Sequence, residues 1–350
     1  MNSTTYGLDL AKKVFQVHWV EPDTGEVRRR TLSRPELSAF FARRSAGVVA
    51  MEACGSAHHW GRVFQSLGHQ VRLIAAQFVR PFVKTNKTDA ADAQAIWEAA
   101  QRPEMRFVAL KSEEQQAILS LHRLRAQCVK MRTMQANQIR GLLYEFGVVV
   151  PLGWRCLLLQ AAPLLADESR RVLPELLRRE LLCQLEAIRS LTERLGQIDR
   201  AITSWQRREA QCQRLTQIPG VGPIIATAIV ATVADAQSFR SGRQFAAFLG
   251  LVPRQTGTGG RVKLLGISKR GDPYLRTLLI QGARTVLIQQ SRVGRTLDPW
   301  LKELLARRHN NVAVVALANK MARIMWALLA HRRDFDPRWK SVFTPAAALN

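Results

Sequence analysis

Four carboxylates in the first hundred residues have the types and spacing of a divalent-metal site. Asp9 and Glu52 each end an apolar, strand-like segment. Asp89 and Asp92 lie three apart in residues 89–100, an alanine-rich segment that is predicted to be a helix. Converging carboxylates supply the hard oxygen ligands that Mg²⁺ prefers, and two Mg²⁺ ions can clamp the attacking and leaving oxygens of a phosphodiester displacement. The sequence therefore predicts that all four acids are metal ligands and catalytic residues.

Asp89 and Asp92 lie on one face of the predicted helix, because residues three apart are neighbours on a helix surface. Two like charges at this spacing destabilise an isolated helix by a few tenths of a kcal/mol, and a bound cation would remove that cost. The alternative interpretation is that one of the two acids caps the helix and complements its dipole.

The first hundred residues predict an RNase H-like domain with a mixed sheet. Apolar runs and partial alternation indicate strands at residues 6–11, 14–20, 26–32, 47–51 and 71–75. Helices are expected at residues 33–43, where a serine and an early proline favour a helix start, and at about 58–67. This order is that of the RNase H-like fold, in which the first strand lies beside the fourth, so Asp9 and Glu52 are expected to be neighbours.

The charge of the chain indicates a nucleic-acid partner. Lys and Arg number 52 against 27 acidic residues, a formal charge of +25, and the isoelectric point is near 11.2. Such a charge attracts polyanions over many ångströms, although a basic surface without a specific partner is the alternative. With 350 residues, 47% of them hydrophobic, the chain is long enough for roughly two or three domains with their own cores.

No membrane association is predicted. The longest apolar run, residues 222–234, is shorter than the roughly 18 to 20 residues of a membrane span, and the apolar segment 312–330 is expected to be a core helix. The first residues have neither a charged leader nor an apolar signal core, so a cytoplasmic location is expected. The five cysteines form no Cys-x-x-Cys pair, which argues against a zinc site or a disulfide framework and favours small buried side chains.

The middle of the chain, from about residue 112 to 217, predicts long helices with a coiled-coil seam. Apolar residues recur there at spacings of three, four or seven, at Leu181, Leu185, Ile188, Leu195, Ile198, Ile202 and Trp205. Two arrangements are open, an antiparallel hairpin within one chain and pairing between protomers.

A Gly-x-Gly turn opens the last third of the chain. Gly220 and Gly222 precede the apolar helix expected at residues 224–233. Such a turn presents backbone N–H groups to an anion, as helix-hairpin-helix modules do with DNA phosphates. A plain turn between two helices would look similar.

A basic, glycine-rich segment follows this turn. Residues 251–276 contain six basic residues and one acid, and hydroxyls at Thr256 and Thr258. Such a loop can bring backbone close to a phosphate and offer it a nucleophile, although a flexible hairpin tip would explain the glycines equally well. The nucleic-acid-binding residues expected in this segment are Arg254, Arg261, Lys263, Lys269 and Arg270.

Five motifs stand in order along nearly the whole chain. They are Gly7-Leu8-Asp9-Leu10-Ala11-Lys12, Met51-Glu52-Ala53-Cys54-Gly55, Asn86-Lys87-Thr88-Asp89-Ala90-Ala91-Asp92-Ala93, Ile218-Pro219-Gly220-Val221-Gly222 and Gly266-Ile267-Ser268-Lys269-Arg270-Gly271-Asp272. Together they closely resemble the DEDD transposases of bacterial insertion sequences, the IS-one-ten family, and most of all its IS-eleven-eleven branch. Their order is far more specific than any one of them.

The resemblance implies three regions: a RuvC-like domain at residues 1–110 that carries the four acids, a helical coiled-coil linker at 111–212, and a mostly helical C-terminal transposase domain at 213–350. It also implies a Mg²⁺-dependent recombinase, with two ions, that acts on the double-stranded DNA of the element ends and target. A structured noncoding RNA guides the family. The family assembles as a homotetramer in which the RuvC-like domain of one protomer meets the C-terminal domain of another.

The chain departs from the family pattern at the nucleophile. In the family a serine in the glycine-rich loop after Pro-Arg attacks DNA to give a covalent intermediate, and this chain has no serine there. Counting from Pro253-Arg254 places Thr258 at that position, with Thr256 and Ser268 as alternatives, or a copy that is impaired or needs no hydroxyl. A threonine hydroxyl can act when a base or metal activates it, but its methyl group restricts the rotamer.

The same residues fit two other functions. A RuvC-like junction-resolving endonuclease would use metal-activated water and form no protein–DNA adduct, and a noncatalytic nucleic-acid-binding protein would not need its acids. Lys12, just past the first strand, is placed to neutralise a phosphate in a transposase or in an endonuclease.

Overall fold

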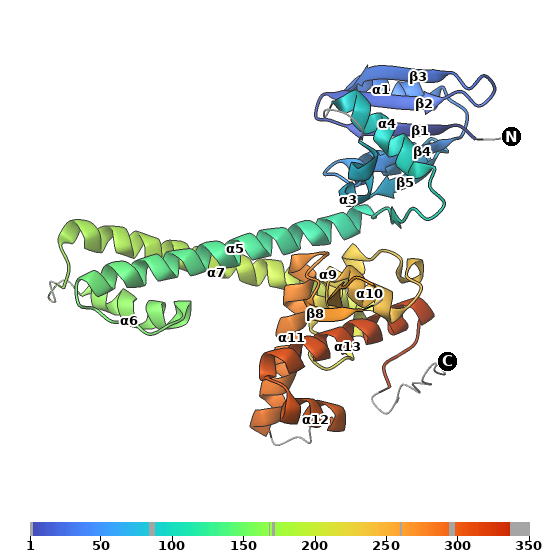
Figure 1. The fold of residues 1–350 in the computed structure, drawn as a ribbon. Coiled ribbons are helices and arrows are strands. Elements are labelled where there is room, and N and C mark those ends of the chain that lie inside the picture. The colour runs from blue at the N-terminus through green and yellow to red at the C-terminus, as the bar shows by residue number, and fades with distance from the viewer. Residues whose placement is uncertain are drawn as a thin grey trace. The chain divides into compact units, whose positions relative to one another are not determined.

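The computed structural model describes residues 3–83, 88–167, 169, 172–259, 261–293 and 298–336 (Figure 1). Asn86 and Lys87 of the third motif, and Gly260 of the glycine-rich loop, lie outside the described residues. The chain divides into two compact units, unit 1 at Met1–Glu114 and unit 2 at Gln115–Asn350. Unit 2 contains the C-terminal region expected from the sequence and all but the first four residues of the expected linker at 111–212.

Unit 1 is built on a six-stranded mixed sheet of order β3-β2-β1-β4-β5-β6. Its strands are β1 (Thr5–Leu10), β2 (Val14–Val20), β3 (Val27–Ser33), β4 (Val48–Glu52), β5 (Gln70–Ile74) and β6 (Phe107–Val108). β1 pairs with β2 in antiparallel fashion and with β4 in parallel fashion. The expectation that the first strand lies beside the fourth is therefore confirmed. β6 was not expected, because a strand of two residues leaves no periodicity to read.

Helices cover both faces of this sheet. They are α1 (Arg34–Ala42), α2 (Ala57–Ser66), the short α3 (Ala76–Val79) with a 3₁₀ turn at Arg80–Phe82, and α4 (Asp89–Ala100). α1 starts with a capping box, in which Glu36 accepts the backbone N–H of Ser33 at 2.8 Å. The main core, which includes Leu8, Phe15 and Phe64, lies on the α1 and α2 face. α4 packs on the opposite face through a smaller cluster that includes Ile96.

Unit 2 is mostly helical. Its helices are α5 (Glu113–Glu145), α6 (Trp154–Ala166), α7 (Glu175–Arg208), α8 (Ala210–Thr216), α9 (Pro223–Thr232), α10 (Gly242–Phe248), α11 (Pro273–Val293), α12 (Pro299–Arg307) and α13 (Asn310–His331), with a 3₁₀ turn at Ala236–Ser238. A two-stranded hairpin, β7 (Pro253–Thr256) and β8 (Lys263–Ile267), stands between α10 and α11. The largest core of this unit joins α8, α9, α10, α11 and α13.

The long helices α5 and α7 pack against each other in antiparallel fashion within the chain. The seven residues of the predicted seam are the buried residues of α7. Arg125 donates to Asp199 at 2.6 Å, and Arg132 donates to Thr192 at 3.4 Å, so residue numbers rise on one helix as they fall on the other. The antiparallel arrangement within one chain is therefore the one observed.

The expectation that all five cysteines are buried is wrong. Cys128 and Cys212 are buried, Cys54 and Cys156 are intermediate, and Cys183 is exposed. Cys183 lies on α7 between the buried Leu181 and Leu185, so a helix turning about 100° per residue carries it away from the buried stripe.

Helix α13 is long and apolar enough to cross a membrane by length and composition alone. Its buried residues, among them Val314, Met321 and Met325, belong to the core of unit 2 and lie against α10 and α11. This burial agrees with the core helix expected at residues 312–330, because a core helix passes the same test of length and composition.

A buried histidine ties three helices of unit 2 together. His122 on α5 lies 2.9 Å from the Tyr274 hydroxyl and 2.9 Å from Oγ1 of Thr227. The Thr227 hydroxyl donates to the carbonyl of Pro223 at 2.7 Å, so its oxygen accepts from Nε2 of His122, and Nδ1 accepts from Tyr274. This pattern requires a neutral ring. Burial, with a smaller effect from Arg125, lowers the pKa of His122 to about 4.

We expect this histidine to make unit 2 acid-sensitive. The folded pKa lies below the unfolded value, so the unfolded chain binds the proton first, and stability is lost as pH falls through the window from 6.5 to about 4. Between pH ~7.5 and ~5 the loss is about 2 kcal/mol. The measurement is urea unfolding at both pH values for the wild type and His122→Gln, which can hydrogen-bond but not titrate. Equal pH dependence in the two proteins would contradict the assignment.

Candidate functional site

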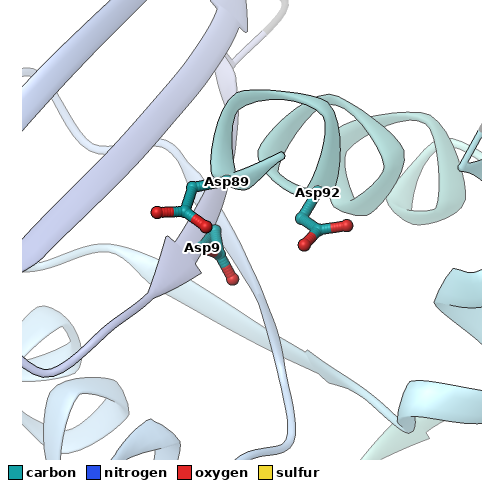
Figure 2. A group of neighbouring side chains, drawn as sticks. All are labelled: Asp9, Asp89 and Asp92. Atoms are coloured by element: carbon teal, nitrogen blue, oxygen red, sulfur yellow. The ribbon is translucent and has the colours of Figure 1, made fainter. Parts of the chain in front are cut away.

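Three aspartates from two elements of unit 1 meet at one edge of the sheet (Figure 2). Asp9 lies near the end of β1, and Asp89 and Asp92 lie on the first turn of α4. One carboxylate oxygen of each lies within 4.8 Å of the other two. Asp9 and Asp92 are half-buried and Asp89 is exposed, so the group is accessible from solvent. The i, i+3 spacing read from the sequence therefore places Asp89 and Asp92 of α4 beside Asp9 of β1.

The approach of α4 to β1 depends on Gly7. A Cβ at this position would collide with the carbonyl oxygen of Ala93 and would stand 2.7 Å from Cβ of Trp97. Without a side chain at Gly7, α4 can lie close enough for its first turn to reach Asp9. The start of the helix is set by Thr88, whose hydroxyl accepts the backbone N–H of Ala91 at 3.3 Å.

This capping bears on the alternative interpretation of the helix acids. The residue that caps α4 is Thr88, and neither aspartate has to do so. Both acids still lie in the first turn, where negative charge is favourable to the helix dipole. The dipole of α4 would be satisfied without the carboxylate oxygens of Asp89 and Asp92 facing the carboxylate of Asp9.

The carboxyl group of Asp9 is poorly suited to carry a charge in the absence of a cation. Burial, followed in importance by the negative charges of Asp92, Asp89 and Glu52, raises its pKa to about 6. A divalent cation at this position would replace lost hydration and neutralise the mutual repulsion. The donor set, which is all carboxylate oxygen, fits Mg²⁺.

Glu52 lies beside the three aspartates but is not one of the closely grouped acids. It ends β4, and the pairing of Leu8 with Met51 on the parallel strands places Glu52 next to Asp9 in the sheet. Its charge contributes to the raised pKa of Asp9. The expected neighbour relation between Asp9 and Glu52 is thus observed, although only the three aspartates have oxygens within mutual ligand distance among the described residues.

The expected hydroxyl nucleophiles lie in unit 2, on or beside the β7–β8 hairpin. Thr256 ends β7, Thr258 lies in the turn after it, and both are exposed. The backbone carbonyl of Thr258 accepts the N–H of Arg261 at 3.2 Å, which closes the turn. Ser268 is half-buried, and its Oγ accepts the backbone N–H of Arg270 at 3.4 Å. The two threonines are therefore more exposed to solvent than Ser268.

The basic residues expected at the nucleic-acid interface surround this hairpin. All five are exposed, namely Arg254, Arg261, Lys263, Lys269 and Arg270. Lys269 adopts a left-handed backbone conformation with φ of 54°, which is uncommon for a residue with a side chain. Its N–H donates to the carbonyl of Gly250 at 3.1 Å, so the conformation is held by the base of the hairpin.

The two glycines of the Gly-x-Gly turn have different roles. Gly220 has φ of +83°, and a Cβ there would stand 2.6 Å from the carbonyl oxygen of Gly282 on α11. Gly220 is therefore explained by backbone packing within unit 2. Gly222 precedes α9, is exposed, and has open space where a side chain would lie. The binding of nucleic acid by these two glycines stays a prediction.

Lys12 is exposed in the connection between β1 and β2, and its carbonyl accepts a hydrogen bond from Arg34 at 3.4 Å. Gln16 and Thr31 were not expected from the motifs, yet they pair across the sheet with Asp9 in one row. Alternation along β2 places Gln16 on the face opposite the core residues Phe15 and Val17. β3 has no such alternation, because Arg28 and Arg30 share the face of Leu32, so register alone places Thr31 in the row of Asp9.

A mixed sheet in this order, with carboxylates at the end of its first strand and on a helix that crosses it, is typical of RNase H-like enzymes that act on nucleic acid. Comparisons with known proteins agree with this class. Residues 6–147 match a DEDD transposase family, and residues 212–298 match the family described as Transposase IS116/IS110/IS902 family.

Several curated relatives extend over most of the chain. The "Probable family 20 transposase" of Pseudomonas aeruginosa is 49% identical over 96% of this chain and 100% of its own length. The transposase for insertion sequence element IS1328 of Yersinia enterocolitica is 42% identical over 96% and 99%. That for IS1111A of Coxiella burnetii is 41% identical over 94% and 90%. The chain belongs to the IS110 family of insertion-sequence transposases, which are enzymes that act on DNA.

Proposed function

We propose that this transposase cuts and exchanges DNA strands in a Mg²⁺-dependent reaction at the group formed by Asp9, Asp89 and Asp92. The observation that supports this most directly is the mutual approach of three carboxylate oxygens within 4.8 Å. Like charges this close are costly unless a cation joins them. The proposal includes Glu52 as the fourth acid, since it adjoins Asp9 at the end of the neighbouring strand.

In this proposal the four acids hold two Mg²⁺ ions. When bound, the ions supply charge neutralisation at the attacking and leaving oxygens of the phosphodiester. The rigid half of the site is the sheet edge that carries Asp9 and Glu52, and α4 contributes Asp89 and Asp92. Lys12 is exposed on the connection that follows β1, where its ammonium group can bind a neighbouring phosphate.

The nucleophile in this proposal is the hydroxyl of Thr258. Its oxygen forms a bond to phosphorus, the bond from phosphorus to one DNA oxygen breaks, and the hydroxyl proton passes to a base while the leaving oxygen takes up a proton. The phosphodiester is conserved as a protein–DNA linkage, so rejoining needs no external energy source. The exposed position of Thr258 in a basic hairpin supports this role.

The partners in this proposal are nucleic acids and other copies of the chain. The formal charge of +25 supports binding of the double-stranded element ends and target, and of a structured noncoding guide RNA. The proposed assembly is a homotetramer in the cytoplasm, in which the carboxylates of one protomer meet the hairpin of another.

The test of this function is reconstitution. Purified protein is combined with DNA carrying the element ends, a target, and the flanking noncoding RNA, in Mg²⁺ or in EDTA. We expect strand cleavage and a covalent protein–DNA adduct in Mg²⁺, no reaction in EDTA, and recovery when Mg²⁺ is added back. Cleavage without an adduct would instead indicate metal-activated water, and cleavage in EDTA would refute the metal site.

A second prediction addresses the nucleophile. Thr258→Ala should abolish the covalent adduct, and Thr258→Ser should retain or increase it, because serine keeps the hydroxyl and removes the methyl group that restricts its approach. Thr256→Ala, two residues away on the same exposed hairpin, is the matched control. The adduct is counted by denaturing gel electrophoresis. If the adduct persists in Thr258→Ala and disappears in Thr256→Ala or Ser268→Ala, the residue whose substitution removes it is the nucleophile.

A further inference from the structure

Two rows of side chains cross β1, β2 and β3 on the face that α4 occupies. The first row is Asp9, Gln16 and Thr31, which are register partners on adjacent strands. The second row is Gly7, His18 and Arg29, which are partners in the same way. Residues that alternate with them point to the opposite face. On that face Leu8, Phe15 and Val17 belong to the main core.

Helix α4 covers the second row. Gly7 lies under Ala93 and Trp97, and the ring of His18 lies 5.5 Å from that of Trp97. Arg29 donates to Oε1 of Gln94 at 3.0 Å. Figure 1 shows the same helix running across the strands of the sheet.

The first row lies beyond this cover. Gln16 is half-buried and Thr31 is exposed. Thr31 donates its hydroxyl to Oε1 of Gln16 at 3.0 Å, which leaves the two N–H donors of the Gln16 amide for another acceptor. The row starts at the aspartate group and ends at β3, which is an edge strand of the sheet.

The chemistry of this face suits a polyanion. Beyond Asp9 the two rows contain an amide, a hydroxyl, an imidazole and a guanidinium group, and no further acid. The Nδ1 atom of His18 is buried without a hydrogen-bond partner within the described residues. Burying a polar atom without a hydrogen bond costs free energy, so packing alone does not explain the polar side chains on this face.

We propose that the row from Asp9 through Gln16 to Thr31, with Arg29 beside it, is a track for the DNA strand whose phosphodiester reacts at the aspartate group. Gln16 and Thr31 hydrogen-bond the sugar–phosphate backbone, and Arg29 pairs with a phosphate. These contacts carry no sequence information and fix the position of the strand. The inference rests on the proposed function, because the aspartate group sets where the track begins.

The neighbouring Arg28 provides a matched control. Arg28 pairs in register with Trp19, a residue of the core on the α1 and α2 face, so it belongs to the opposite face of the same strand. It is exposed and forms an ion pair with Glu26 at 2.8 Å. Arg28 and Arg29 thus carry the same charge on the same edge strand, on opposite sides of the sheet.

The experiment is site-specific crosslinking with the full chain. The photocrosslinker p-benzoylphenylalanine is incorporated at position 31 and, in a second protein, at position 28. Each protein is mixed with a duplex of the element's end and the flanking noncoding RNA, in Ca²⁺. Crosslinks are counted whether or not the DNA has been cut. The readout therefore does not depend on activity, and failure of the metal-dependent reaction would be seen separately in the reconstitution assay.

We expect position 31 to crosslink to one DNA strand beside the cleavage position and position 28 to give no such product. Arg29→Ala should raise the half-saturating DNA concentration about fivefold, as expected for the loss of one exposed phosphate contact, and Arg28→Ala should leave it unchanged. Equal crosslinking from both positions, or none from position 31, would overturn the track. Crosslinks from position 31 to RNA in place of DNA would overturn the assignment of the strand.

Discussion

Replacing Asp9 by asparagine is expected to lower the rate of DNA cleavage roughly a thousandfold, because metal coordination supplies several kcal/mol of transition-state stabilisation. The same substitution should slightly stabilise the metal-free protein. The pKa of Asp9 is raised to about 6, so above that pH the ionised carboxylate is unfavourable in the folded state. The amide removes this repulsion, with a gain of roughly 1 kcal/mol, since water screens a half-buried group.

These opposite changes separate a functional role of Asp9 from a structural one. If Asp9 only supported the fold, its substitution would lower stability and activity together. If Asp9 is a functional acid that destabilises the fold, neutralising it lowers activity and raises stability. Cleavage rates and urea unfolding without metal, both at pH ~7.5, measure the two effects. Asp89→Asn and Asp92→Asn should also lower the cleavage rate, because both carboxylates belong to the same group.

The control for Asp9 is another acid of unit 1. Asp23→Asn removes an exposed carboxylate from the connection between β2 and β3 and should change neither quantity. Retention of full activity in Asp9→Asn would refute the proposed metal site, and a marked loss of stability would refute the repulsion among its acids.

Replacing Gly7 by alanine is the second substitution with a large expected effect. The new Cβ would collide with the carbonyl oxygen of Ala93 and crowd Trp97, so α4 must shift away from the sheet. Overpacking of this kind costs about 2 kcal/mol of unfolding free energy. The shift would also carry Asp89 and Asp92 away from Asp9, so cleavage should fall along with stability.

Gly55→Ala is the matched control for Gly7, because nothing lies within 4 Å of a Cβ at Gly55. Urea unfolding and the cleavage assay, applied to both variants, measure the effect. If Gly7→Ala and Gly55→Ala behave alike, the close approach of α4 does not position the aspartates.

Local signals in the sequence predicted much of unit 1. The helix that carries Asp89 and Asp92 was expected over 89–100 and is observed as α4 at Asp89–Ala100, because alanine-rich sequence and a threonine cap specify a helix without help from packing. The order of strands and helices also placed β1 beside β4 correctly. The buried residues of α7 followed from apolar spacing alone.

Other features could not be read from local patterns. Cys183 was expected to be buried from its residue type, but its place on α7 exposes it. The role of Gly220 in phosphate binding stays a prediction, and its close approach to Gly282 on α11 is encoded by no motif. Gln16 and Thr31 lie in no motif, and only strand register shows that they continue the row that begins at Asp9.

The acids, most helices and strands, and the apolar face of each could be read from the chain alone, because those properties depend on residue type and on periods of two or 3.6 residues. The fold was needed to show that three aspartates from β1 and α4 lie within ligand distance of one another and that Glu52 lies beside them. It also decided that a polar row continues from them to the sheet edge. These outcomes depend on register and on how closely a helix approaches a sheet, which at Gly7 is set by a missing side chain.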